Sequence, residues 1–183
     1  MIDVRDDLED EDAPYFESTR RVSDGFDARL LREPLTVMQV QRPLTLSSAA
    51  TVTEAMRAMQ REHRSCVLVT DDGTMRSKLI GIFTERDVLF RIVDKGRNPA
   101  ALPVGEVMTP NPENLSARAT VAYVLNKMSV GGFRHVPVVD DEHRPVCVIS
   151  VRDVVNFLVN AFPREVLNLP EQGTSPPVSR EGA

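Results

Sequence analysis

The chain has 183 residues, of which 42% are hydrophobic and 27% are charged, with a formal net charge of −5. These values are typical of a globular protein that buries its own core, and the acidic balance argues against nucleic acid as a partner. No apolar run reaches the roughly 18 residues of a membrane span, and the start MIDVRDDLEDED is unlike a signal peptide. We therefore expect no membrane partner and a cytoplasmic location.

The N-terminus is strongly acidic. Residues 1–12 contain seven carboxylates and a single arginine, a composition typical of a solvated, mobile segment. We expect residues 1–30 to form a flexible extension.

A first structured unit is predicted over residues 35–97. LTLSSA is short and extended, and a helix follows, with a capping box at Thr51 and Glu54 and apolar residues at helical spacing at Val52, Ala55, Met56 and Met59. CVLV and LIGIF are predicted strands on either side of a turn, and a last helix begins at Glu85. The predicted order is β-α-β-β-α.

After a proline-containing linker at 98–106, residues 107–162 repeat this unit. Val37-Met38 matches Val107-Met108, Arg64 matches Arg134, and GIFTERDVL matches CVISVRDVV. The second copy lacks the capping acid after its helix-starting threonine, and Gly131-Gly132 is predicted to end its first helix. One copy could hardly bury a core alone, so the two are expected to pack face to face. Residues 163–183 form a C-terminal tail.

The last helix of each copy, VLFRIV and VVNFLVNAF, is apolar on more than one side. Contact between the copies covers part of this surface. The remainder favours a symmetric homodimer over a single deeply buried helix.

The two cysteines, Cys66 and Cys147, lie within apolar runs and are expected to be buried free thiols. A disulfide is disfavoured in the cytoplasm. His63 and Cys66 have half of a zinc-binding spacing, but no second half follows, so no metal is expected.

A hydroxyl residue followed three positions later by an aspartate starts the last helix of each copy. Thr84 with Asp87 and Ser150 with Asp153 each fit a helix cap and nothing more, and the pair also fits two copies of a ligand site. A helix start after a strand favours a phosphate. Cations that suit one lie nearby in the sequence, at Arg86, Arg152, Arg64, Arg134 and His135. A carboxylate suits ribose hydroxyls, and apolar strand residues suit a flat base, so the chemistry indicates an adenosine phosphate.

The doubled unit, the Val-Met before each first strand, the strand RHVPVVD and the G-h-x-T/S-x-x-D motif resemble a tandem pair of cystathionine-β-synthase (CBS) domains, a Bateman module. The resemblance implies an α+β fold in which two β-α-β-β-α repeats pack with pseudo-two-fold symmetry, as a disc-like homodimer. It also implies a non-catalytic regulatory module that binds AMP, ADP or ATP, or less favourably S-adenosylmethionine, between the repeats and signals to an unknown effector protein.

Carried over by position, the resemblance assigns Asp87 and Asp153 to the ribose and Thr84 and Ser150 to ribose or phosphate. The pocket with Asp153 is expected to use the segment before the first repeat. The full predicted site comprises Thr84, Arg86, Asp87, Ser150, Arg152, Asp153, Arg64, Arg134 and His135, with base-lining Val40, Leu44, Pro112 and Leu115. Cys147 replaces the family's usual glycine, which either narrows the pocket or places a thiol in the core.

Two other functions compete with this one. Ser150, His135 and Asp153 could be drawn as a catalytic triad, but no nucleophile elbow surrounds Ser150, so no catalytic residue is assigned. The other is a structural or protein-interaction module whose pockets stay empty, with the two motifs acting as helix caps only.

Overall fold

The structure, a computed structural model, describes residues 28–38, 40 and 42–163. The predicted N-terminal extension lies outside this range up to residue 27, and its end belongs to the 3-10 helix η2 at Ala28–Arg32. The predicted C-terminal tail lies outside from residue 164 onward. No helix within the described range is long and apolar enough to cross a membrane.

The first repeat has the predicted β-α-β-β-α order. Its elements are β1 Thr45–Ser47, α2 Val52–Arg61, β2 Cys66–Thr70, β3 Leu79–Thr84 and a last helix made of α3 Glu85–Asp87 and the π-helix η4 Val88–Val93. The capping box at the start of α2 is confirmed. The π-helical turn was not predicted, and it is absent from the matching helix of the second repeat.

The second repeat has the same order, with β5 Leu115–Ser116, α4 Val121–Gly131, β6 His135–Val139, β7 Pro145–Ser150 and α5 Val151–Ala161. Gly132 ends α4 in the left-handed conformation, with φ of 66°, as predicted. Between the repeats lie η5 Val104–Glu106 and the two-residue strand β4 Thr109–Pro110, which extends the first sheet to the order β1-β2-β3-β4. The second sheet has the order β5-β6-β7.

The registers of the two hairpins correct the alignment of the repeats. Cys66 pairs with Thr84 in the first hairpin, and His135 pairs with Ser150 in the second. Both hairpins also have a bulge at the fourth residue of their first strand. Cys66 therefore corresponds to His135.

This correspondence shifts the predicted match by one residue. Arg134 is equivalent to Ser65, and Arg64 is equivalent to Phe133. The sequence pairing of Arg64 with Arg134 was wrong, because it follows the identity of the two arginines, whereas the helices that begin at Val52 and Val121 and the strands that begin at Cys66 and His135 keep one constant offset.

The segment that precedes strand β1 packs on the second repeat. Leu35 N donates to Ala119 O at 3.1 Å, and Val121 N donates to Glu33 O at 3.0 Å. Leu35 and Met38 are buried in the core of the second repeat. The second repeat thus completes its core with residues that precede strand β1.

The converse holds for the segment that precedes the second repeat, which packs on the first. Val52 N donates to Leu102 O and Val104 N to Ala50 O, both at 2.8 Å. Val104 and Val107 are buried in the core of the first repeat.

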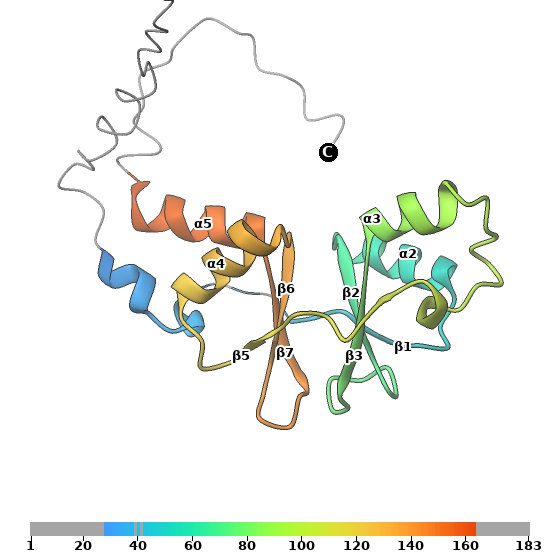
Figure 1. Cartoon of the computed structure of the whole chain (residues 1–183), viewed down its shortest axis with the longest axis horizontal. Helices are drawn as coiled ribbons and strands as arrows, with labels where there is room; N and C mark the ends of the chain where they lie inside the picture. The colour runs from blue at the N-terminus through green and yellow to red at the C-terminus, as the bar shows by residue number, and fades with distance from the viewer. Residues whose placement is uncertain (1–27, 39, 41, 164–183) are drawn as a thin grey trace, which may run out of the picture.

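The two repeats share a third core cluster between their sheets. Cys66, Leu68, Leu79 and Ile82 from the first repeat pack with Val139 and Val148 from the second. In Figure 1, β2 and β3 lie beside β6 and β7 at the middle of the molecule, with the helices of each repeat on its outer side. The face-to-face packing predicted from the repeat is confirmed, and it places the starts of α3 and α5 on either side of a shared cleft.

Candidate functional site

Both repeated motifs are capping boxes. Thr84 N and Oγ1 donate to Asp87 Oδ2 at 2.9 and 2.8 Å, and Asp87 N donates back to Thr84 Oγ1 at 3.3 Å. Ser150 N and Oγ both donate to Asp153 Oδ2 at 2.7 Å, and Asp153 N donates to Ser150 Oγ at 3.3 Å. The cap hypothesis is therefore confirmed for both. It does not exclude a ligand, because each cap uses a single carboxylate oxygen and leaves the other for a further donor.

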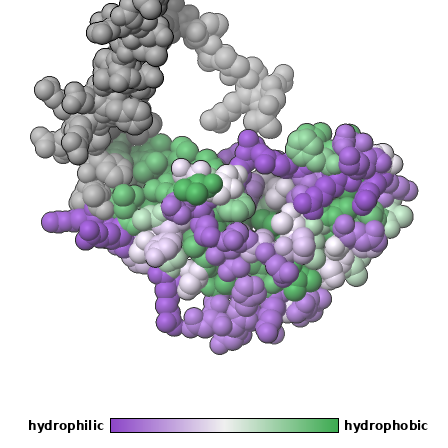
Figure 2. All heavy atoms as spheres, viewed as in Figure 1, coloured by the Kyte–Doolittle hydropathy of each residue, from purple (hydrophilic) through white to green (hydrophobic). Residues whose placement is uncertain are grey.

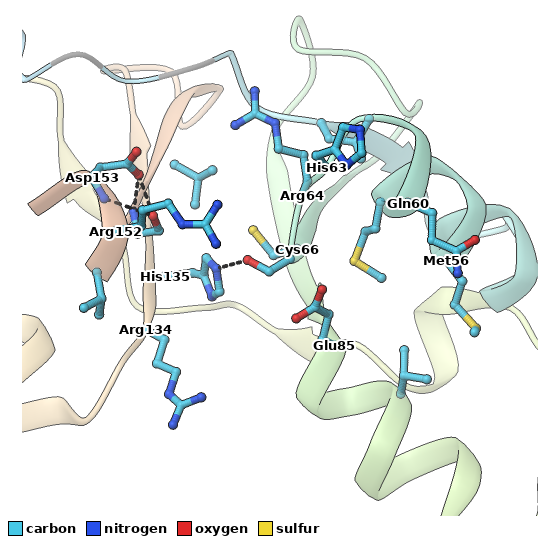
Figure 3. Close-up of a pocket in the computed structure, with 17 residues that line it drawn as sticks. Met56, Gln60, His63, Arg64, Cys66, Glu85, Arg134, His135, Arg152 and Asp153 are labelled. Carbon is cyan, nitrogen blue, oxygen red and sulfur yellow. Dashed lines mark hydrogen bonds between the residues drawn. The ribbon is translucent and has the colours of Figure 1, made fainter. Parts of the chain in front are cut away.

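Asp153 lies in a cavity of about 910 Å³ between the repeats, which we call the Asp153 cavity. Figure 3 shows Arg152 and His135 extending from the second repeat towards Cys66 of the first. The lining comprises Leu44, Met56, Met59, Gln60, His63, Arg64, Ser65, Cys66, Glu85, Val88, Arg134, His135, Val148, Ser150, Val151, Arg152 and Asp153.

Cations outnumber carboxylates around the Asp153 cavity. Its lining has three arginines, Arg64, Arg134 and Arg152, against the two carboxylates of Glu85 and Asp153. Arg64 also contacts the segment before β1, because its Nη2 donates to Arg42 O at 3.2 Å. Guanidinium groups recognise phosphate oxygens in paired hydrogen bonds. The cavity is thus suited to an anion.

His135 lies at the centre of the cleft. Its Nε2 is 2.6 Å from the Ser65 hydroxyl oxygen of the other repeat. Burial lowers the pKa of His135 below its usual value, an effect that Asp153 opposes and Arg134 reinforces. The imidazole is therefore held in its neutral form near neutral pH, where it can both donate and accept a hydrogen bond.

Part of the lining of the Asp153 cavity is apolar. Leu44, Met56, Met59 and Val148 contribute to it, together with the thiol of Cys66. Burial raises the pKa of Cys66 to about 12, so the thiol stays protonated and unreactive. Methionine side chains adapt to flat ring systems, so these apolar residues are suited to contact a base.

Asp87 lies in a second cavity of about 520 Å³, which we call the Asp87 cavity. Here Arg91 Nε is 3.1 Å from Asp87 Oδ1, on the oxygen that the cap leaves over. Three arginines are balanced by three carboxylates. The lining comprises Ser65, Ile82, Thr84, Glu85, Arg86, Asp87, Leu89, Phe90, Arg91, Thr109, Pro112, Glu113, Gly132, Phe133, Arg134 and His135.

Most of the predicted site residues line one cavity or both. The Asp153 cavity contains the predicted Leu44, Arg64, Arg134, His135, Ser150, Arg152 and Asp153, and the Asp87 cavity contains the predicted Thr84, Arg86, Asp87, Pro112, Arg134 and His135. Leu44 lies with Asp153, as expected for a pocket that uses the segment before the first repeat.

Two predicted lining residues lie elsewhere. Leu115 is buried in the core of the second repeat, and Val40 packs against the same core. Strand β5 begins at Leu115 and turns its side chain to the core, which the alternation of that short strand did not reveal. Cys147 is also in this core and lines neither cavity, and burial raises its pKa to about 11. Of the two possibilities for Cys147, the structure shows the packed thiol.

Several lining residues were not assigned to the site from the sequence. Met56 and Met59 were assigned to the core face of α2, and Arg91 was not singled out at all. Met59 does both, because it is buried in the first core and also borders the cavity. The apolar edge of an amphipathic helix carried no separate signal, whereas the spacing of Arg91 from Asp87, one helical turn, could have indicated their ion pair.

The arrangement does not support a triad. The Ser150 hydroxyl donates to Asp153 and the His135 ring bonds to Ser65, so Ser150 and His135 do not face one another as nucleophile and base. Within the described part of the chain, no group of three or more histidine, cysteine, aspartate or glutamate side chains could hold a metal ion. Both cysteines are free and buried.

A protein-family model described as CBS domain matches residues 37–94 and 104–160. The Arabidopsis thaliana CBS domain-containing protein CBSCBSPB2 is 32% identical over 138 residues, which cover 75% of this chain and 24% of that protein. A Schizosaccharomyces pombe protein, Meiotically up-regulated gene 70 protein, is 31% identical over 137 residues, or 75% of this chain and 18% of that protein. The chain thus spans about a quarter or less of the length of these relatives.

Solved structures show the same fold. A CBS-domain containing protein from Agrobacterium tumefaciens aligns with a TM-score of 0.58 and 28% identity, covering 68% of this chain and 89% of that one. A CBS domain pair solved with 5′-methylthioadenosine and S-adenosyl-L-methionine aligns with a TM-score of 0.61 and 23% identity, covering 70% of this chain and 97% of that one.

Proposed function

The chain belongs to the CBS domain family, and on that premise we propose that it is a non-catalytic regulatory module that binds an adenine nucleotide, AMP, ADP or ATP, between its two repeats. The observation that carries the proposal is the composition of the Asp153 cavity. A carboxylate with one unengaged oxygen, three arginines and apolar side chains lie around a space of about 910 Å³. These groups suit a ribose, a phosphate and a base, respectively.

The charge of the cavity favours nucleotides over S-adenosylmethionine. The sulfonium of that ligand is positive, and the cavity presents Arg64, Arg134 and Arg152 to it. A phosphate group in the same position neutralises guanidinium charge instead. The solved relative with S-adenosyl-L-methionine supports the adenosyl part of the proposal, and the arginines support the phosphate part.

Isothermal titration of the full chain with AMP, ATP and S-adenosylmethionine tests the proposal. We expect AMP or ATP to bind with micromolar to sub-millimolar affinity and more tightly than S-adenosylmethionine. Asp153→Asn retains an acceptor for the helix cap but removes the charge, and we expect it to weaken binding about tenfold or more. The matched control is Asp141→Asn, which changes an exposed carboxylate paired with Arg118. Absence of heat and of thermal stabilisation with every ligand at millimolar concentration would instead support the ligand-free interaction module.

The signal is proposed to pass through the contacts between the repeats. A ligand that contacts Asp153 of one repeat and Arg64 of the other binds best at one separation of the two. It therefore shifts the population towards that geometry only by its difference in affinity for the two states. An effector protein would sense this change.

We also propose a homodimer formed through the helices. Leu89, Phe90 and Val93 of η4 are each more than half exposed, and Val151 and Val155 of α5 are exposed as well. Figure 2 shows apolar surface over the helices of both repeats. Such a patch on a globular protein marks an interaction site.

Light scattering tests the dimer. We expect twice the 20.4 kDa chain mass for the wild type and a monomer for Phe90→Glu, because a buried unpaired carboxylate is costly. Val146→Glu, at an exposed apolar residue on strand β7 rather than on a helix, is the control that should remain dimeric. A wild-type monomer at high concentration would refute the dimer.

A further inference from the structure

The two aspartates of the repeated motif are equivalent in sequence but not in their contacts. Asp87 Oδ1 is paired with Arg91 Nε at 3.1 Å. Asp153 Oδ1 has no partner among the described residues, and its carboxylate faces the larger cavity. The difference arises four residues beyond each aspartate, where the first repeat has Arg91 and the second has Phe157.

Arg91 is held from several sides. Besides Asp87, its guanidinium donates to Val107 O at 2.7 Å, to Met108 O, and to Thr109 Oγ1 at 3.1 Å. All three of its nitrogens are therefore engaged, and the side chain ties η4 to the segment that enters β4. Phe157 makes no such link, because it packs against the core of the second repeat.

A ribose and the Arg91 guanidinium present the same kind of group to Asp87, namely N–H or O–H donors. The side chain of Asp87 is only 10% exposed, and its two oxygens already accept from Thr84 and Arg91. A ribose would have to displace a charge-assisted pair that is formed within the protein and needs no ordering on binding. At Asp153 the ligand meets a free oxygen.

The volumes and the available arginines of the two cavities also favour a ligand in the Asp153 cavity. The Asp87 cavity measures about 520 Å³ against about 910 Å³. One of its three arginines, Arg91, is committed to Asp87 and to the carbonyls of Val107 and Met108, which leaves Arg86 and Arg134 for a ligand. Of its remaining carboxylates, Glu113 is paired with Lys127. In the Asp153 cavity, none of the three arginines is paired with a carboxylate of the described residues, so one more guanidinium is available to a phosphate there.

We propose, resting on the proposed function, that the chain binds one adenine nucleotide, in the Asp153 cavity, and that Arg91 closes the Asp87 cavity by occupying the place of the ligand's ribose donors. The residue four positions after the motif aspartate thus decides which repeat binds. Arg91 is a specificity-determining residue that acts by pairing Asp87 and not by touching the nucleotide.

Equilibrium dialysis of the full chain against radiolabelled AMP measures the number of sites. We expect one equivalent per chain for the wild type and loss of that equivalent, by about tenfold or more in affinity, for Asp153→Asn. Arg91→Met removes the guanidinium, and we expect a second equivalent. In the double variant Asp153→Asn/Arg91→Met, one equivalent should return. Arg97→Met, at an exposed arginine outside both cavities, should bind as the wild type does.

The results separate this inference from the proposed function. Two equivalents bound by the wild type, or one equivalent retained by Asp153→Asn, would overturn the inference while leaving nucleotide binding intact. No binding by the wild type would overturn both. If Arg91→Met fails to fold because the linker is released, the wild-type stoichiometry and the Asp153→Asn result still decide between one site and two.

Discussion

The Ser65 hydroxyl oxygen lies 2.6 Å from Nε2 of His135, in a hydrogen bond that joins the two repeats across their shared cleft. Both residues line both cavities. A ligand in either cavity that changes the separation of the repeats would therefore change the length of this hydrogen bond.

We expect Ser65→Ala to lower the free energy of unfolding by about 1 kcal/mol, because it leaves the partly buried His135 nitrogen without its partner. Urea denaturation measures this. Ser129→Ala, at an exposed serine on α4, is the matched control and should change stability by less than about 0.5 kcal/mol. Equal effects of the two substitutions would mean that the bond contributes nothing.

The same contact makes stability depend on pH. Burial lowers the pKa of His135 below its usual 6.5, so the unfolded chain takes up this proton at a higher pH than the folded chain does. The contribution of the neutral imidazole is fully present above pH 6.5 and is lost as the pH falls below 6.5 through the folded-state pKa.

This dependence can be measured by urea denaturation at about pH 7.5 and about pH 5.5. The wild type should lose stability between the two values, and His135→Gln should lose less. His143→Asn is the control, because His143 is exposed and has a positive φ that asparagine tolerates. A wild-type loss that persists unchanged in His135→Gln would place the titrating group elsewhere.

The two first helices offer an internal comparison of capping. The Thr51 side chain accepts from Glu54 N in a full capping box, whereas Thr120 makes no side-chain cap bond. Thr51→Ala should therefore cost about 1 kcal/mol of unfolding free energy, and Thr120→Ala less than half of that. Thermal or urea denaturation checks the pair, and equal losses would show that the cap at Thr51 does not stabilise α2.

Gly81 lies directly against the side chain of Met108. A Cβ added at Gly81 would lie 2.2 Å from Met108 Sδ. We expect Gly81→Ala to lower the unfolding free energy by about 1–3 kcal/mol. In a double-mutant cycle, Met108→Ala should make Gly81→Ala less damaging, since the methionine side chain is the clashing group. Strict additivity of the two substitutions would contradict this explanation.

Gly81 and Cys147 occupy matching positions, but their neighbours differ. Cys147 packs in the second core, where Met38 is also buried, so a small thiol is accommodated there. The sequence indicated that the substitution existed and left two consequences open. Only the tertiary packing around Cys147 in the second core decided between them.

Most of the fold could be predicted from local and repeated patterns in the sequence. The repeat, the helical spacing of Val52 to Met59 and the capping boxes are local or periodic features, and the structure has them where they were predicted. The pairing of Arg64 with Arg134 failed because similarity of residue type is a weaker constraint than hydrogen-bond register. The π-helical turn of η4 carried no recognisable signal.

The sequence by itself determined that two copies of one unit exist and that the last helix of each begins with a capping hydroxyl and an aspartate. It also showed that cations lie near both aspartates in the sequence. These properties depend on neighbours within a few residues along the chain. The tertiary structure decided which cations meet which aspartate. Arg64 of the first repeat lines the cavity of Asp153 because the sheets of the two repeats pack on one another, and Arg134 borders both cavities. Arg91 pairs with Asp87 because a one-turn spacing and the carbonyls of Val107 and Met108 hold it there.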